Sequence, residues 1–105
     1  MDSEHRELIR RLTLSDEATL ADVMAGRLGL GQQILDDRTR NLVRLAGLIA
    51  LDAKTASLQA TTEAAFATGA REEEIVEVLL VCAPILGTSR VNSVIPRLRR
   101  SLERD

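Results

Sequence analysis

The chain has 105 residues, which is enough for one domain and too few for two. Hydrophobic residues make up 45% of it and charged residues 29%, so it is too apolar to be disordered, and its net charge of −2 argues against general binding to nucleic acid. Its single cysteine, Cys82, excludes an internal disulfide and a CxxC redox pair.

The sequence carries no signal for secretion or membrane insertion. Residues 1–5 are acidic where a secretory signal would be basic. The longest apolar run, residues 78–86, is far shorter than the roughly 20 residues that cross a bilayer. We therefore expect a cytoplasmic protein that has neither a membrane nor a nucleic acid as partner.

Apolar residues recur at helical spacing almost throughout, and no segment alternates as a half-buried strand would. Residues 3–11 predict one or two helical turns. A second helix is expected from a cap at Ser15 to Gly26, and its inner face comprises Ala18, Ala21 and Met24. The glycines of residues 26–31 follow no strand and precede no lysine at P-loop spacing. They predict a connection, because glycine is typical of helix ends.

A stronger helix is predicted from Asp36 or Asp37 to about Leu51. Its inner stripe comprises Leu42, Leu45, Ala46, Ile49 and Ala50. Residues 45–51 are apolar all round, which predicts burial on more than one side. Gly47 is unfavourable inside a helix, so we expect another helix to approach closely there.

Three further helices are expected in the second half of the chain. The first covers residues 55–68, ends at Gly69 and presents Leu58, Ala65 and Phe66. The second begins near Arg71 and carries Ile75, Val78, Leu79 and Cys82. The last begins at Thr88 or Ser89 and carries Val91, Val94, Ile95, Leu98 and Leu102. Pro84 predicts a kink or an early end, and Pro96 predicts an interruption of the last helix.

Two stretches resemble the carboxymuconolactone decarboxylase family and its alkylhydroperoxidase D-type relatives. Residues 35–51 read LDDRTRNLVRLAGLIAL, and residues 69–80 read GAREEEIVEVLL, followed by Gly87. The resemblance covers about residues 14–100. It implies one all-α domain, residues 1–105, of about six helices with the alkylhydroperoxidase D-like fold. It also implies trimers or hexamers with sites at or near subunit interfaces.

The chain differs from this family at the positions where family members carry their catalytic residues. Decarboxylase-type members place a Glu and a His on the helix before the first glycine, where this sequence has Ser57 and Thr61. Their frequent tyrosine is replaced by Ile85. The CxxCxxxH positions of the peroxidase relatives are Lys54, Ser57 and Thr61 here. Because proton transfer needs a suitable acid or base, and a dithiol cycle needs two thiols, we expect no catalytic residue and no cofactor.

The first hypothesis is a homo-oligomer whose pocket persists without catalytic groups. Its lining residues would be Ser57, Thr61, Cys82 and Ile85. Such a site suits a small apolar or carboxylated metabolite.

The second hypothesis is an active enzyme of the family, either a lactone decarboxylase or a peroxiredoxin-like antioxidant protein. Glu63 or a residue of a neighbouring subunit would then be the base, and Cys82 the only thiol for a one-cysteine peroxidase. A third is a partner-binding module that uses the apolar surface of the last helix.

The other chemically versatile side chains are expected on the surface. His5, the only histidine, lies close to the N-terminus. Basic residues near the C-terminus are a candidate phosphate site, although cations also suit a helix C-terminus; they are Arg97, Arg99, Arg100 and Arg104. No spacing of ligands predicts a metal site.

Overall fold

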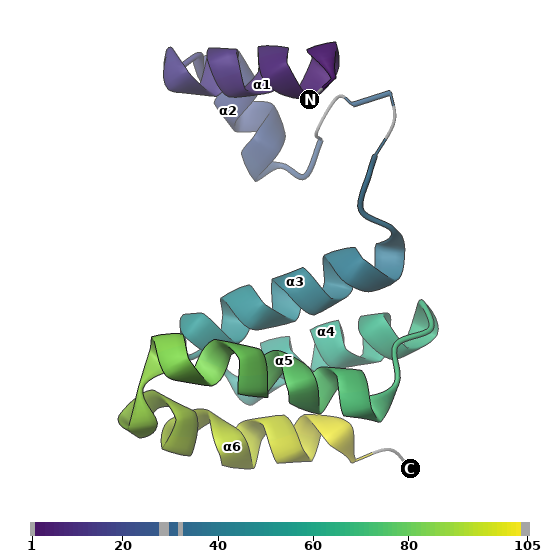
Figure 1. The fold of residues 1–105 in the computed structure, drawn as a ribbon, viewed down its shortest axis with the longest axis vertical. Coiled ribbons are helices and arrows are strands. Elements are labelled where there is room, and N and C mark those ends of the chain that lie inside the picture. Colours follow the sequence, from purple (N-terminus) through teal and green to yellow (C-terminus); the bar gives the residue numbers. More distant parts are fainter. Residues whose placement is uncertain (1, 28–29, 32, 104–105) are drawn as a thin grey trace. The chain divides into compact units, whose positions relative to one another are not determined.

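The computed structural model describes residues 2–27, 30–31 and 33–103. These residues form six helices and no strand (Figure 1): α1 (Ser3–Thr13), α2 (Glu17–Met24), α3 (Asp37–Ala50), α4 (Thr55–Ala67), α5 (Glu72–Leu86) and α6 (Thr88–Leu102). The predicted all-α fold of about six helices is confirmed. The chain divides into an N-terminal unit, which ends at Ile34 and holds α1 and α2, and a C-terminal unit, which begins at Leu35 and holds the other four.

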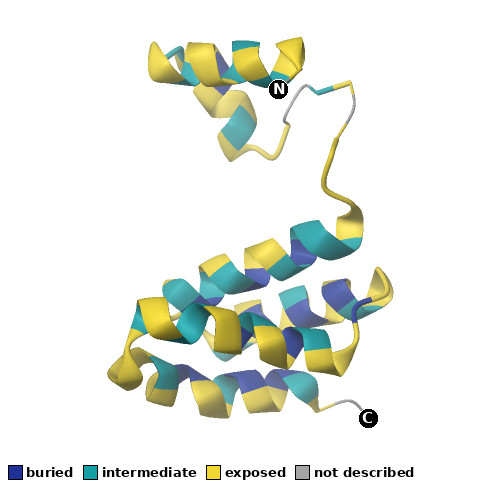
Figure 2. Ribbon diagram, in the orientation of Figure 1, coloured by how far each residue is buried: buried dark blue, intermediate teal, exposed yellow. Residues whose placement is uncertain are grey.

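Helices α3 to α6 form a four-helix arrangement in which each helix has two neighbours. Both α3 and α6 pack against α4 and α5, so α4 and α5 occupy opposite corners. In the ribbon, α3 and α5 run in one direction and α4 and α6 in the other (Figure 1). Figure 2 shows where buried residues lie along these helices. All buried apolar residues among those described lie in this unit; they are Leu45, Ile49, Leu58, Ala65, Ala70, Ile75, Leu79, Val94 and Leu98.

The ends of these helices follow local rules of the sequence. Asp36 caps α3, and its carboxylate accepts a hydrogen bond from the Thr39 N–H at 2.8 Å, as the predicted start requires. Gly69 and Gly87 have φ values of +100° and +84°, which an L side chain rarely adopts. The chain therefore turns after α4 and between α5 and α6 at the glycines that the sequence predicts.

The two prolines differ in their outcome, since α5 ends shortly after Pro84 whereas α6 is not interrupted at Pro96. Helix α5 continues past Pro84 to Leu86, and α6 runs through Pro96 without a break. Val94 and Leu98 lie on either side of Pro96 and are almost completely buried in the core. Their packing offsets the backbone hydrogen bond that Pro96 cannot donate, so the predicted interruption is wrong.

The N-terminal helices also differ from the predictions. Helix α1 is longer than predicted, at 11 residues, and begins at an Asp2 cap. Helix α2 begins after Asp16, and Ser15 cannot cap it because its φ is +58°. The predicted inner face of α2 is wrong, since Ala18, Ala21 and Met24 are all exposed. Thr19 is the only buried residue among those described up to residue 34, so none of the apolar side chains described in this unit is buried.

The second half of α3 is not covered on all sides within the chain. Gly47 is exposed, and a Cβ placed on it would have no neighbour within 4 Å among the described residues. The predicted close approach of another helix at Gly47 is therefore wrong for the single chain. Val43 and Leu51 are also exposed, by 57% and 79%. The outer side of α3 is consequently an open apolar surface.

Two arginines of α6 fasten that helix to the turn between α3 and α4. Arg90 donates a hydrogen bond to the carbonyl of Ala50 at the end of α3. Arg97 forms an ion pair with the Asp52 carboxylate and donates to the carbonyl oxygens of Ala53 at 3.0 Å and Asp52 at 3.2 Å. The Arg90 contact satisfies a carbonyl group that the end of a helix leaves without a partner, and the Arg97 contacts satisfy two carbonyl groups of the turn.

A polar atom lies unpaired in the core of the four-helix unit. Thr62 is completely buried, and its hydroxyl oxygen has no hydrogen-bond partner among the described residues. Since such a group gives up its bonds to water, we expect Thr62→Val to raise the free energy of unfolding by about 1 kcal/mol. Urea unfolding measures this change. Thr61→Val, at a half-buried neighbour, is the control and should change little; an equal gain there would contradict the explanation.

The four-helix unit should fold without the N-terminal unit, because every buried apolar side chain of the described chain belongs to it. We expect a chain that begins at Leu35 to keep its helical circular dichroism and a cooperative thermal transition. Loss of that transition, or NMR spectra without amide dispersion, would show that the N-terminal unit supplies essential packing.

Candidate ligand-binding site

Helices α3 and α5 leave an open groove between them, with a volume of about 330 Å³. Five of its lining residues are apolar, and the others are a threonine, two glutamates and the cysteine; they are Leu42, Val43, Ala46, Val78, Val81, Thr39, Glu74, Glu77 and Cys82. The groove is thus mainly apolar with a few polar groups, which is typical of a site for a small molecule.

The helical repeat explains how α5 contributes to this groove. Ile75 and Leu79 point into the core, four residues apart. Val78, Val81 and Cys82 follow the same spacing on the next face of the helix, which lies toward α3. Helix α5 therefore uses one apolar face for the core and a second apolar face for the groove.

Glu74 ties the two helices together at the beginning of the groove. It accepts a hydrogen bond from the Arg71 N–H at 2.9 Å and forms an ion pair with Arg38 of α3. The pKa of Glu74 is lowered below its usual value, mainly by the hydrogen bond from the Arg71 N–H and further by Arg38. The Glu74 carboxylate is thus ionised and already occupied by protein donors.

Glu77 differs from Glu74 in having no such partner. Its side chain makes no hydrogen bond or ion pair within the described part of the chain, and the residue is exposed. The groove therefore has one uncompensated carboxylate beside its apolar lining. Such a group can attract a cation or accept a proton from a bound molecule.

The four residues predicted to line a pocket lie on two helices. Ser57, which is exposed, and Thr61, which is half-buried, are on α4, whereas Cys82 and the largely exposed Ile85 are on α5. Of the four, Cys82 lines the groove between α3 and α5. Because α4 and α5 occupy opposite corners, a pocket that includes all four residues stays a prediction.

Sequence reasoning missed most of the groove, including Thr39, Val43 and Glu77. The available signal was the spacing of residues 74, 77, 78, 81 and 82 on one side of a helix. That signal identifies a groove only when the neighbouring helix is known, and the pairing of α3 with α5 was not predicted.

The remaining candidates are placed as follows. The Nδ1 atom of His5 lies 2.7 Å from the Asp2 carboxylate on α1, and Glu63 is exposed on α4. Arg97 is paired with Asp52 and Ala53, so it is not available to the candidate phosphate site. Arg99 and Arg100 are exposed, and Arg104 lies outside the described residues.

The described residues contain neither a metal-binding cluster nor a membrane-spanning helix. No group of three or more His, Cys, Asp or Glu side chains is arranged to hold a metal ion in that part of the chain. None of the helices described there is both long and apolar enough to span a bilayer.

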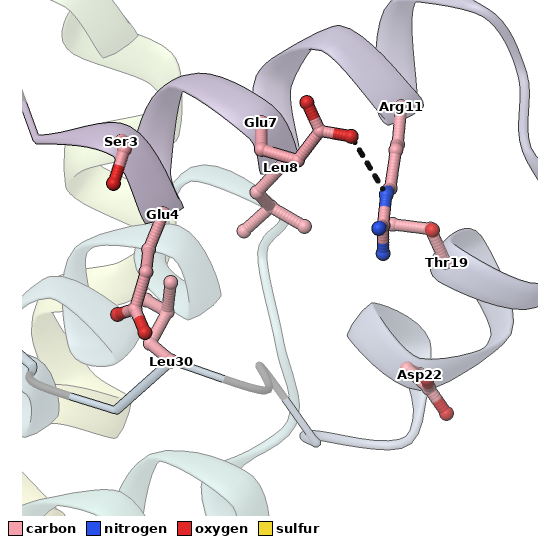
Figure 3. Close-up of a pocket in the computed structure, with 8 residues that line it drawn as sticks. All are labelled: Ser3, Glu4, Glu7, Leu8, Arg11, Thr19, Asp22 and Leu30. Atoms are coloured by element: carbon pink, nitrogen blue, oxygen red, sulfur yellow. Dashed lines mark hydrogen bonds and ion pairs between the residues drawn. The ribbon is translucent and has the colours of Figure 1, made fainter.

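A second cavity, also of about 330 Å³, lies within the N-terminal unit (Figure 3). Its charged side chains are already paired. Glu7 accepts hydrogen bonds from Arg10 at 2.7 Å and from Arg11 at 3.1 Å. These bonds lower the pKa of Glu7 to about 2, and the bond from Arg10 has the larger effect. Glu4 accepts from the Gly31 N–H at 3.0 Å, and Asp22 pairs with Arg27. The groove between α3 and α5, which has an unpaired carboxylate, is therefore the better candidate.

The chain was also compared with known proteins. The model of the carboxymuconolactone decarboxylase family matches residues 17–99, a range that includes both stretches on which the resemblance depends. No curated protein and no solved structure matches the chain.

Proposed function

Because the chain belongs to the carboxymuconolactone decarboxylase family, we propose that it is a homo-oligomeric member that binds a small apolar molecule without the family's usual decarboxylase or CxxC peroxidase chemistry. The observation that carries this proposal is the apolar groove between α3 and α5. The family resemblance adds that Ser57 and Thr61 stand where a Glu and a His are expected. Neither hydroxyl can act as a general base near neutral pH.

The dimensions and lining of the groove support a small ligand. A volume of about 330 Å³ lies at the lower end of the roughly 300–1,000 Å³ that ligand pockets span. Of the two ligand classes that the sequence favours, the apolar one fits this groove better. A carboxylated molecule would be repelled by Glu77, which has no cationic partner among the described residues.

The outer side of α5 supports assembly with further copies of the chain. Val76, Leu80 and Ile85, which do not line the groove, are exposed by 38%, 60% and 86%. Single exposed apolar residues are ordinary, but several on one helix are typical of an interaction surface. The family resemblance implies a trimer or a hexamer, and we adopt that assembly in the proposal.

Native mass spectrometry of freshly purified protein tests both parts of the proposal. We expect a mass of three or six chains, together with a discrete additional mass from a retained small molecule. A monomer without any additional mass would contradict the proposal and favour a partner-binding module. An assembly that carries no additional mass would uphold self-association and contradict the retained ligand.

A second candidate is an active enzyme of the family that uses residues other than the usual ones. The observation that favours it is that Glu77 and Cys82, a carboxylate and the only thiol, line the same groove. In a peroxidase reaction, the thiolate would attack the O–O bond of a hydroperoxide, release an alcohol and become a sulfenic acid, which an added thiol would reduce. Consumption of an alkyl hydroperoxide that Cys82→Ser abolishes would establish this activity. Equal consumption by the variant would exclude it.

A further inference from the structure

We infer that the ligand of the α3/α5 groove is an organic cation, with an apolar body on the groove lining and an ammonium group paired with Glu77. This inference rests on the proposed function, because it names the class of molecule that the same groove would take. It depends on the charges around the groove and on the absence of a protein partner for Glu77 within the described residues.

Neither the helix dipole nor the neighbouring charges favour a carboxylate at position 77. Glu72, Glu73 and Glu74 lie in the first turn of α5, where the helix dipole favours negative charge. Glu77 lies beyond that turn. Its neighbours three and four residues earlier are Glu74 and Glu73, and like charges at this spacing destabilise a helix. A bound cation would relieve this repulsion.

Among the described residues no basic side chain lines the groove, and three arginines of α3 and the start of α5 are paired within the protein. Arg38 is paired with Glu74, and Arg71 lies 3.7 Å from Glu73. Arg44 of α3 donates to the Asn41 side chain at 3.4 Å and does not line the groove. The α3 side of the groove presents Thr39, Leu42, Val43 and Ala46, of which none carries a charge. Since none of the described residues that line the groove carries a positive charge, the groove favours a bound molecule that supplies the cation for Glu77.

The apolar lining of the groove indicates that the rest of the ligand is a hydrocarbon body. Leu42 and Val78 are half-buried against the core, while Val43 and Val81 are exposed by 57% and 75%. Covering these side chains removes apolar surface from water, which stabilises a bound hydrocarbon chain. An ammonium group on such a chain combines this contribution with the attraction of Glu77.

Three probes with the same six-carbon chain test the inference: hexylammonium, 1-hexanol and hexanoate. Cys82 is the only thiol and lines the groove, so the rate at which iodoacetamide alkylates it reports whether the groove is occupied. Shifts of the Ala46 and Val78 amide signals locate the probe independently. Because an exposed ion pair contributes up to about 1 kcal/mol, we expect hexylammonium to bind about three- to fivefold more tightly than hexanol. Hexanoate should bind most weakly.

Two variants with the same change in charge separate the role of Glu77 from a general effect of net charge. Glu77→Gln should remove the preference for hexylammonium over hexanol while leaving the binding of hexanol unchanged. Glu63→Gln, at an exposed position on α4 outside the groove, should keep the preference. Equal affinities for the three probes, or a preference that survives Glu77→Gln, would overturn the inference and leave the proposed apolar site intact. Failure of all three probes to protect Cys82 would overturn both.

Discussion

Leu80→Glu together with Ile85→Glu is expected to convert the proposed oligomer into monomers. Both side chains are exposed on α5, by 60% and 86%, so glutamate at these positions does not disturb the core of the single chain. In an interface each would contribute about 2 kcal/mol per subunit through apolar burial. Glutamate would remove this contribution and place an unpaired charge in the contact. Light scattering after size-exclusion chromatography measures the mass.

The control for this experiment adds the same two charges beside the proposed interface. Thr88→Glu and Ser89→Glu lie at exposed positions in the first turn of α6, where negative charge suits the helix dipole. This control should keep the mass of the unmodified protein. If the Leu80 and Ile85 variant kept its mass as well, the outer side of α5 would not be the interface.

Arg97→Met is expected to lower the free energy of unfolding of the four-helix unit by about 2 kcal/mol, because hydrogen bonds that involve a charged group contribute roughly 1.5–3 kcal/mol. The guanidinium joins α6 to the carbonyl groups of Asp52 and Ala53 and to the Asp52 carboxylate. Methionine keeps much of the apolar stem and removes only the donors and the charge. Urea unfolding followed by circular dichroism gives the change.

Arg99→Met provides a matched control on the same helix. Arg99 is exposed, and no hydrogen bond or ion pair of its side chain occurs within the described residues. We expect its substitution to change stability by less than about 0.5 kcal/mol. Equal losses in the two variants would mean that net charge, and not the contact with the turn, accounts for the effect of Arg97.

Local signals were sufficient to predict the four helices of the C-terminal unit. Asp36 is an N-cap, and Gly69 and Gly87 adopt positive φ. The helix boundary at each of these positions could therefore be predicted without knowing which other helix packs there. The prediction of an interruption at Pro96 failed because the effect of this proline depends on the burial of Val94 and Leu98 against other helices. Propensity is a weak guide wherever tertiary packing decides.

The candidate site was much less predictable than the fold. Cys82 was identified because it is the only thiol, and its neighbours in the sequence gave no indication of a groove. Thr39 and Glu77 come from different helices, 38 positions apart in the chain. Only the packing of α3 beside α5 makes them neighbours of one cavity. The spacing within each helix gives its faces, but it does not give the helix that a face meets.

The contacts of Arg90 and Arg97 also determine how the C-terminal unit opens. They join residues that are 40 to 45 positions apart, and the intervening chain contains α4 and α5. Closing so long a loop costs conformational entropy, so these contacts form only when the intervening helices are already packed. We expect the end of α3 to stay ordered as long as α6 is in place, because the arginine contacts hold it. We therefore expect opening there to accompany the cooperative unfolding of all four helices, so that amide hydrogens at this end exchange at the rate of that global event.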